Sequence, residues 1–106
     1  MDAFISYSHA DRQFVQRLRD ALVERSKSVW VDEQDIPAAS RWADDLKGAI
    51  EGADSFVFVI SPDSAASLEC RKELDHAVGL NKRIIPLNLR ETPIGDLPEE
   101  LGRRQF

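Results

Sequence analysis

Disulfides and long apolar segments are both missing from this sequence, and their absence narrows the class of protein. A single cysteine cannot form an internal disulfide, which excludes a disulfide-rich secreted scaffold and suits a reducing compartment. No apolar run approaches the roughly 18 residues that a membrane-spanning helix needs, and the N-terminus lacks the basic-then-apolar pattern of a signal peptide. The sequence therefore predicts a cytoplasmic protein with no membrane partner.

Basic residues are also in the minority. Lys and Arg number 14 against 19 Asp and Glu, which gives a formal net charge of -5. This balance argues against nucleic acid or an anionic membrane as the main partner. Hydrophobic residues make up 42% of the 106 positions, enough for one core, and no linker or internal repeat divides the chain. We therefore expect a single domain over residues 1–106.

Strand-type and helix-type apolar patterns alternate along the chain. Short apolar or β-branched runs predict four strands, at residues 2–7, 29–31, 55–60 and 83–89. Apolar residues spaced three and four apart predict three helices, following Ser8 with Asp11 as a capping box, following Ser40, and over residues 67–80. A turn is expected at residues 61–64, and Pro86 predicts an edge position or a bulge for the last strand. This order is typical of an α/β fold whose parallel sheet carries helices on both faces and its ligand site at the carboxyl ends of the strands.

The sequence lacks the motifs that the common activities of such folds require. No Gly-x-Gly-x-x-Gly or P-loop follows the first strand, and no Gly-x-Ser-x-Gly presents a nucleophile. Ser8 and Ser61 stand where a phosphoacceptor domain needs acidic residues to hold magnesium. Cys70, Glu73 and His76 fall at i, i+3 and i+6, but this spacing favours a buried thiol beside two surface side chains over a metal site. No metal is expected.

Glu73 is the carboxylate with the best case for chemistry. The third predicted helix has an apolar stripe, formed by Cys70, Leu74, Ala77 and Val78. At about 100° per residue, Glu73 lies on the border of that stripe, partly buried, with Glu69 one turn earlier. A partly desolvated carboxylate suits a general base or a stabiliser of positive charge. The alternative, a boundary glutamate paired with Arg71 or Lys72, stays open and is the one that spacing alone favours.

Three ordered motifs resemble the TIR domain (Toll/interleukin-1 receptor homology) family. They are the first box Asp2–Tyr7, a BB loop running from Trp30–Pro37 to Arg41 and Trp42, and Ile60–Pro62 followed by the Cys-x-x-Glu-Leu of Cys70–Leu74. The resemblance implies a flavodoxin-like three-layer αβα sandwich with parallel strand order 2-1-3-4-5. Because the family usually continues into a fifth strand and a closing helix, we expect the chain to be truncated at its C-terminus. A sensor or repeat domain is then expected elsewhere in the parent protein.

One function implied by the resemblance is cleavage of the nicotinamide–ribose bond of NAD⁺ by a signalling effector in innate immunity or antiphage defence. Enzymatic members release nicotinamide and ADP-ribose or a cyclised form on oligomerisation, with NAD⁺ as substrate and no cofactor. The glutamate of Cys-x-x-Glu-Leu is catalytic in them, and it corresponds to Glu73. The resemblance also implies four substrate-binding residues, which are Trp42, Ser8, His9 and Arg41.

The other implied function is homotypic binding of other TIR domains without chemistry. Its contact surface would be the BB loop, represented by Asp32, Asp35, Ile36, Pro37 and Ala38. Enzymatic members often carry an aromatic residue one turn before the catalytic glutamate, where this chain has Glu69. Trp42 suits either a ring stacked on substrate or the anchor of a helix face. Catalysis and scaffolding therefore both remain open from the sequence.

Overall fold

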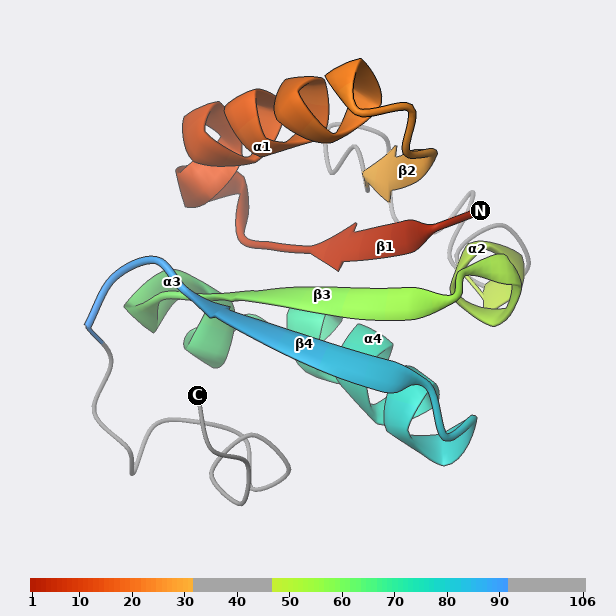
Figure 1. The fold of residues 1–106 in the computed structure, drawn as a ribbon. Coiled ribbons are helices and arrows are strands. Elements are labelled where there is room, and N and C mark those ends of the chain that lie inside the picture. Colours follow the sequence, from red (N-terminus) through yellow and green to blue (C-terminus); the bar gives the residue numbers. More distant parts are fainter. Residues whose placement is uncertain (32–46, 92–106) are drawn as a thin grey trace.

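The computed structural model describes residues 1–31 and 47–91, and its four strands form one parallel sheet (Figure 1). The strands are β1 Ala3–Ser6, β2 Val29–Val31, β3 Ser55–Ile60 and β4 Arg83–Asn88. Their order is β2-β1-β3-β4, and every neighbouring pair is parallel. This confirms the predicted α/β class and the 2-1-3-4 part of the flavodoxin-like order. The expectation that the chain is truncated before a fifth strand and closing helix concerns residues outside the described ranges.

Helices cover the sheet on both faces and thereby form three layers (Figure 1). They are the 3₁₀ helix η1 His9–Asp11 and the α-helices α1 Arg12–Glu24, α2 Lys47–Gly52, α3 Pro62–Ala66 and α4 Leu68–Gly79. Because successive strand side chains alternate between faces, neighbouring residues of β1 enter different cores. Phe4 packs with Ile50 of α2 and Leu74 of α4, whereas Ile5 packs with Val15 of α1.

The centre of the sheet is built from aromatic and β-branched side chains. The Phe4 ring stacks between those of Trp30 and Phe56, with centroid separations of 5.0 and 5.5 Å. These rings come from β1, β2 and β3, so the stack crosses three adjacent strands and adds to the energy of burial. In β3, Ile60 and the four residues before it are all buried, as a continuous apolar run in a central strand predicts. Trp30 is partly buried and packs against this core.

Two local predictions, a turn and a helix cap, differ from the structure. The turn expected at residues 61–64 is the beginning of α3, where Ser61 is the N-cap and Pro62 occupies the first turn. Proline is common both in turns and in the first turn of a helix, so Ser61 and Pro62 are compatible with either structure. Ser8 caps only the short η1, by accepting a hydrogen bond from the Ala10 N–H, and Asp11 makes no cap. The predicted capping box is therefore wrong.

Candidate functional site

Buried polar side chains gather at one end of the sheet. Among the described residues they are Ser6, Asp11, Ser61, Ser64 and Glu73. Ser6 ends β1, Asp11 lies in the turn that follows it, and Ser61 and Ser64 come directly after β3. Burying polar groups costs free energy unless they are hydrogen-bonded, so a cluster of them marks either a fixed structural contact or a functional site. Its location agrees with the carboxyl-end site that the parallel sheet predicts.

Glu73 is the fully buried member of this group that the sequence singled out. Its side chain, like that of Ser6, has a relative exposure of 0%. The Ser6 hydroxyl donates a hydrogen bond to Glu73 Oε1 at 2.7 Å, across 67 positions of the chain. The expectation of a border position, partly buried, is therefore wrong. Helix α4 packs against β1 and β3, and this packing brings Glu73 under the end of β1, which periodicity alone cannot show.

Glu69 has a different environment from Glu73, although the two are one helical turn apart. It is exposed in the first turn of α4. A carboxylate there is stabilised by the positive end of the helix dipole and by solvent. Because one carboxylate is hydrated and the other is buried, Glu73 is the one whose electrostatic effect on a bound molecule would be strong.

The other predicted site residues divide into described and undescribed positions. Ser8 and His9 follow β1, two and three residues after Ser6. Ser8 is half-buried and caps η1, while exposed His9 has Nε2 within 3.3 Å of Arg12 Nη1. The remaining predictions lie outside the described residues, namely Arg41, Trp42, Asp32, Asp35, Ile36, Pro37 and Ala38.

A second buried carboxylate network was missed by the sequence analysis. The Ser61 hydroxyl donates to Asp11 Oδ2 at 2.5 Å, and Arg90 Nη2 donates to Asp11 Oδ1 at 2.8 Å and also to Asp63. The Asp11 side chain is only 3% exposed. The hydrogen bond that Arg90 donates to Asp63 and the nearby Asp11 charge raise the pKa of Arg90 above its ordinary value. No local sequence pattern predicts this network, because its members come from η1, from the start of α3 and from the residues after β4.

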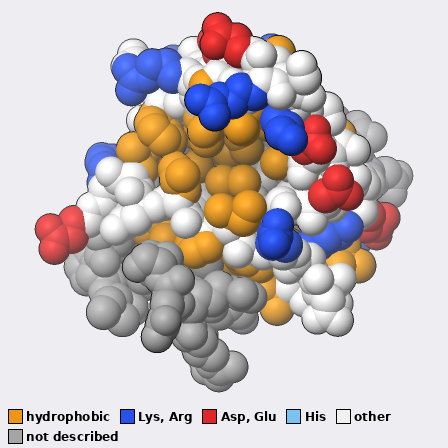
Figure 2. All heavy atoms as spheres, viewed as in Figure 1, with side chains coloured by type: hydrophobic (Ala, Val, Ile, Leu, Met, Phe, Trp, Pro, Cys, Tyr) orange, Lys and Arg blue, Asp and Glu red, His pale blue; other side chains and the backbone are white. Residues whose placement is uncertain are grey.

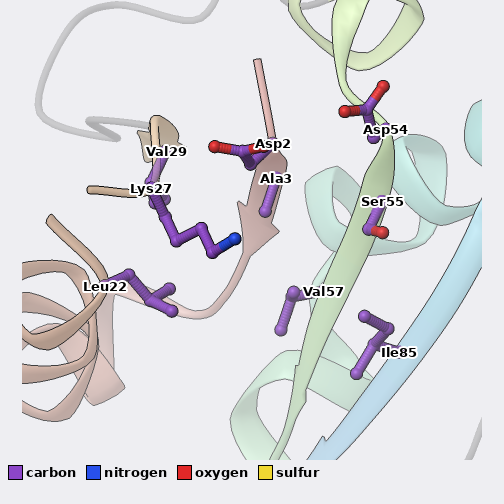
Figure 3. Close-up of a pocket in the computed structure, with 9 residues that line it drawn as sticks. All are labelled: Asp2, Ala3, Leu22, Lys27, Val29, Asp54, Ser55, Val57 and Ile85. Atoms are coloured by element: carbon purple, nitrogen blue, oxygen red, sulfur yellow. The ribbon is translucent and has the colours of Figure 1, made fainter. Parts of the chain in front are cut away.

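The described part of the chain also contains a cavity of about 340 Å³, at the other end of the strands (Figure 3). Apolar side chains line this cavity together with charged ones near the strand starts. The lining residues are Asp2, Ala3, Leu22, Lys27, Val29, Asp54, Ser55, Val57 and Ile85. Figure 2 shows hydrophobic side chains gathered at the centre of the face seen in Figure 1, with Lys and Arg side chains around them. Glu73 does not line this cavity, so the cavity and the buried carboxylate are separate features.

Residues 1–31 and 47–91 contain neither a cluster suited to a metal nor a membrane-spanning helix. Within them, no three His, Cys, Asp or Glu side chains lie together as a metal would require. No helix in these ranges is both long and apolar enough to span a bilayer. Cys70 is buried beside Leu74, while His76 lies 3.8 Å from a carboxylate oxygen of Glu51.

Comparison with known proteins points to one family. The sequence model described as "TIR domain" matches residues 3–106. Among solved structures, the TIR domain of the Toll-related receptor TRR-2 from Hydra magnipapillata is 27% identical, with a TM-score of 0.82, and the match covers 99% of this chain and 81% of that one. None of the curated proteins matches the chain.

Two larger assemblies contain similar domains. A metazoan TIR-STING receptor from C. gigas is 28% identical with a TM-score of 0.75, and the match covers 94% of this chain and 34% of the receptor. The TIR domains of the activated Roq1 resistosome, which directly recognises the pathogen effector XopQ, are 25% identical with a TM-score of 0.68. That match covers 80% of this chain and 55% of the other, so this chain spans only part of both proteins.

Proposed function

The chain belongs to the TIR domain family, and on this premise we propose that it cleaves the nicotinamide–ribose bond of NAD⁺ with Glu73 as the catalytic carboxylate. The products would be nicotinamide and ADP-ribose or its cyclised form. The supporting observation is the burial of Glu73 at the carboxyl end of the sheet, with Ser6 hydrogen-bonded to it. NAD⁺ is the substrate in this proposal, no further cofactor is involved, and the role is that of a signalling effector.

The chemistry of the bond explains why a buried carboxylate supports this proposal. Departure of nicotinamide leaves positive charge on the ribose, in an oxocarbenium-like transition state. A fixed negative charge stabilises that state most where water is excluded. Cys70 and Leu74, the helix neighbours of Glu73 on its buried side, are fully buried as well and supply such an environment.

Burial of Glu73 also bears on when the reaction would occur. Its side chain has no exposed surface, so contact with a ribose needs a rearrangement at the end of the sheet. TIR domains commonly self-associate. We propose that assembly supplies this rearrangement, with the segment of residues 32–42 contacting a neighbouring copy. Ser8, His9, Arg41 and Trp42 are the proposed substrate-binding residues around it.

The direct test is release of nicotinamide by the purified protein at high concentration or under crowding, followed by chromatography. We expect Glu73→Gln to lower turnover by about a hundredfold or more, the size of effect typical for loss of one electrostatic stabiliser. The matched control is Glu69→Gln, which removes an exposed carboxylate from the same helix and should leave turnover unchanged. Absence of turnover by the assembled wild-type protein would refute NAD⁺ cleavage. Full activity in Glu73→Gln would refute the assigned role.

A second function, as a non-catalytic TIR–TIR interaction module, is favoured by one observation. Glu69 is an exposed carboxylate at the position where enzymatic members often carry an aromatic residue. In that case Glu73 has a structural role only. The protein would self-associate without releasing nicotinamide, and Glu73→Gln would change stability and leave assembly intact.

A further inference from the structure

We propose that Ser6 is a positioning residue that holds the Glu73 carboxylate in place and in its anionic form. The inference rests on the proposed function of Glu73 and extends it to a residue of another element. Its basis is the 2.7 Å hydrogen bond from Ser6 Oγ to Glu73 Oε1, made between two side chains of 0% exposure.

The position of Ser6 is fixed by the sheet. It is the last residue of β1 and is paired in parallel register with Phe58 of β3. Side chains two residues apart on a strand share a face, so Ser6 lies on the same face as Phe4, whose core includes Leu74 of α4. The hydroxyl is therefore directed toward α4, and two rigid elements set the distance between donor and carboxylate.

The direction of the hydrogen bond determines its electrostatic effect. A hydroxyl that donates to a carboxylate stabilises the charged form of the acid relative to the neutral form. Such charge-assisted bonds are stronger than neutral ones, and burial strengthens them further. Removing the hydroxyl should therefore allow Glu73 to take up a proton at higher pH and to leave its position beneath the end of β1.

The test compares Ser6→Ala and Ser6→Cys with a matched control, Ser61→Ala. The cysteine variant keeps the shape of the side chain, with a somewhat larger terminal atom, while replacing a strong donor by a weak one. Ser61 is also a fully buried serine at the carboxyl end of a strand, but its hydroxyl binds Asp11 instead of Glu73. We expect both Ser6 variants to lower kcat for NAD⁺ cleavage by about tenfold or more, with KM within about twofold, since the contact acts in the transition state.

The second readout is the pH dependence. In the Ser6 variants the acidic limb of the kcat profile should move to higher pH, and in Ser61→Ala it should stay in place. An unshifted limb, or a kcat loss in Ser61→Ala equal to that in Ser6→Ala, would overturn the inference, because a general loss of stability would then explain both.

A third measurement separates this inference from the proposed function. The ¹³C carboxyl resonance of Glu73 can be followed against pH in the wild type and in Ser6→Ala without any substrate. A midpoint that moves to higher pH supports control of Glu73 by Ser6, and an unmoved midpoint overturns it. A moved midpoint in a protein that never releases nicotinamide would refute NAD⁺ cleavage, and with it a positioning role of Ser6 in that reaction.

Discussion

Ser61→Ala should destabilise the domain more than the loss of an ordinary helix cap. The Ser61 hydroxyl makes two contacts at once, because it donates to Asp11 Oδ2 at 2.5 Å and accepts from the Ser64 N–H at 3.1 Å. Both partners and Ser61 itself are buried. Alanine removes the cap of α3 and leaves Asp11 Oδ2 without this donor.

The expected loss follows from the two contacts. A hydrogen bond to a charged group contributes about 1.5–3 kcal/mol, and a helix N-cap contributes about 1 kcal/mol. The free energy of unfolding should therefore fall by about 2.5–4 kcal/mol. For a domain of about 100 residues this corresponds to a Tm lower by more than about 10 °C.

The chain offers a matched control in Ser67→Ala. Ser67 is the N-cap of α4 and accepts from the Cys70 N–H at 3.3 Å. Its loss should cost only the cap, about 1 kcal/mol. Urea unfolding followed by circular dichroism measures both variants, and a double-mutant cycle of Ser61→Ala with Asp11→Ala should give a coupling energy of about 1–2 kcal/mol. A loss in Ser61→Ala no larger than in Ser67→Ala, or a coupling energy near zero, would refute this account of the network.

Two further predictions concern pH and assembly. The Ser28 N–H donates to Asp2 Oδ2 at 2.7 Å and lowers the pKa of Asp2, so this carboxylate stabilises the fold above about pH 4 and stops doing so as pH falls through the folded pKa. Urea midpoints of wild type and Asp2→Asn should therefore differ at pH 7 and converge as the pH falls below the folded pKa of Asp2, and a constant difference would contradict the charge effect. Ile36→Ser should weaken self-association in sedimentation velocity, whereas Val23→Ser, at an exposed apolar position of α1, should not; equal effects would count against residues 32–42 as the contact.

The strands were predictable here because each corresponds to a short run of consecutive apolar or β-branched residues. The runs at 29–31 and 55–60 match β2 and β3 as the structure has them, because β-branched and aromatic residues favour strands. Strand β3 is central and buried on both faces, whereas β2 is a partly buried strand at one edge of the described sheet. The start of α3 was not predictable in this way. Ser61 and Pro62 are compatible with a turn and with a helix N-terminus, and in the structure Ser61 and Ser64 form the reciprocal hydrogen bonds of a capping box, which favours the helix.

The sequence was enough to single out Glu73 as a candidate site residue, but not to predict which residues surround it. Periodicity placed Glu73 on the edge of a helical stripe, whereas the structure buries it fully and gives it a hydrogen bond from Ser6, which is 67 positions away. Asp11 was assigned to a local cap for the same reason, although its partners Ser61 and Arg90 lie 50 and 79 positions further along. Local spacing reports which face of a helix a residue occupies. It carries no information on which strand end will meet that face.

The two buried carboxylates, Asp11 and Glu73, differ in their hydrogen-bond partners and therefore in their expected roles. Both oxygens of Asp11 receive donors, one from Ser61 and one from the guanidinium of Arg90, and the Leu89 and Arg90 N–H groups also donate to the Ile60 carbonyl. These hydrogen bonds connect the segments that follow β3 and β4, so the role of Asp11 is structural. Glu73 accepts a hydrogen bond on Oε1 from the neutral Ser6 hydroxyl at the end of β1, and this contact orients the carboxylate and favours its charged form. A carboxylate oriented in this way suits the stabilisation of a cationic transition state, which is why our proposal gives the chemistry to Glu73 and uses the Asp11 network as its structural control.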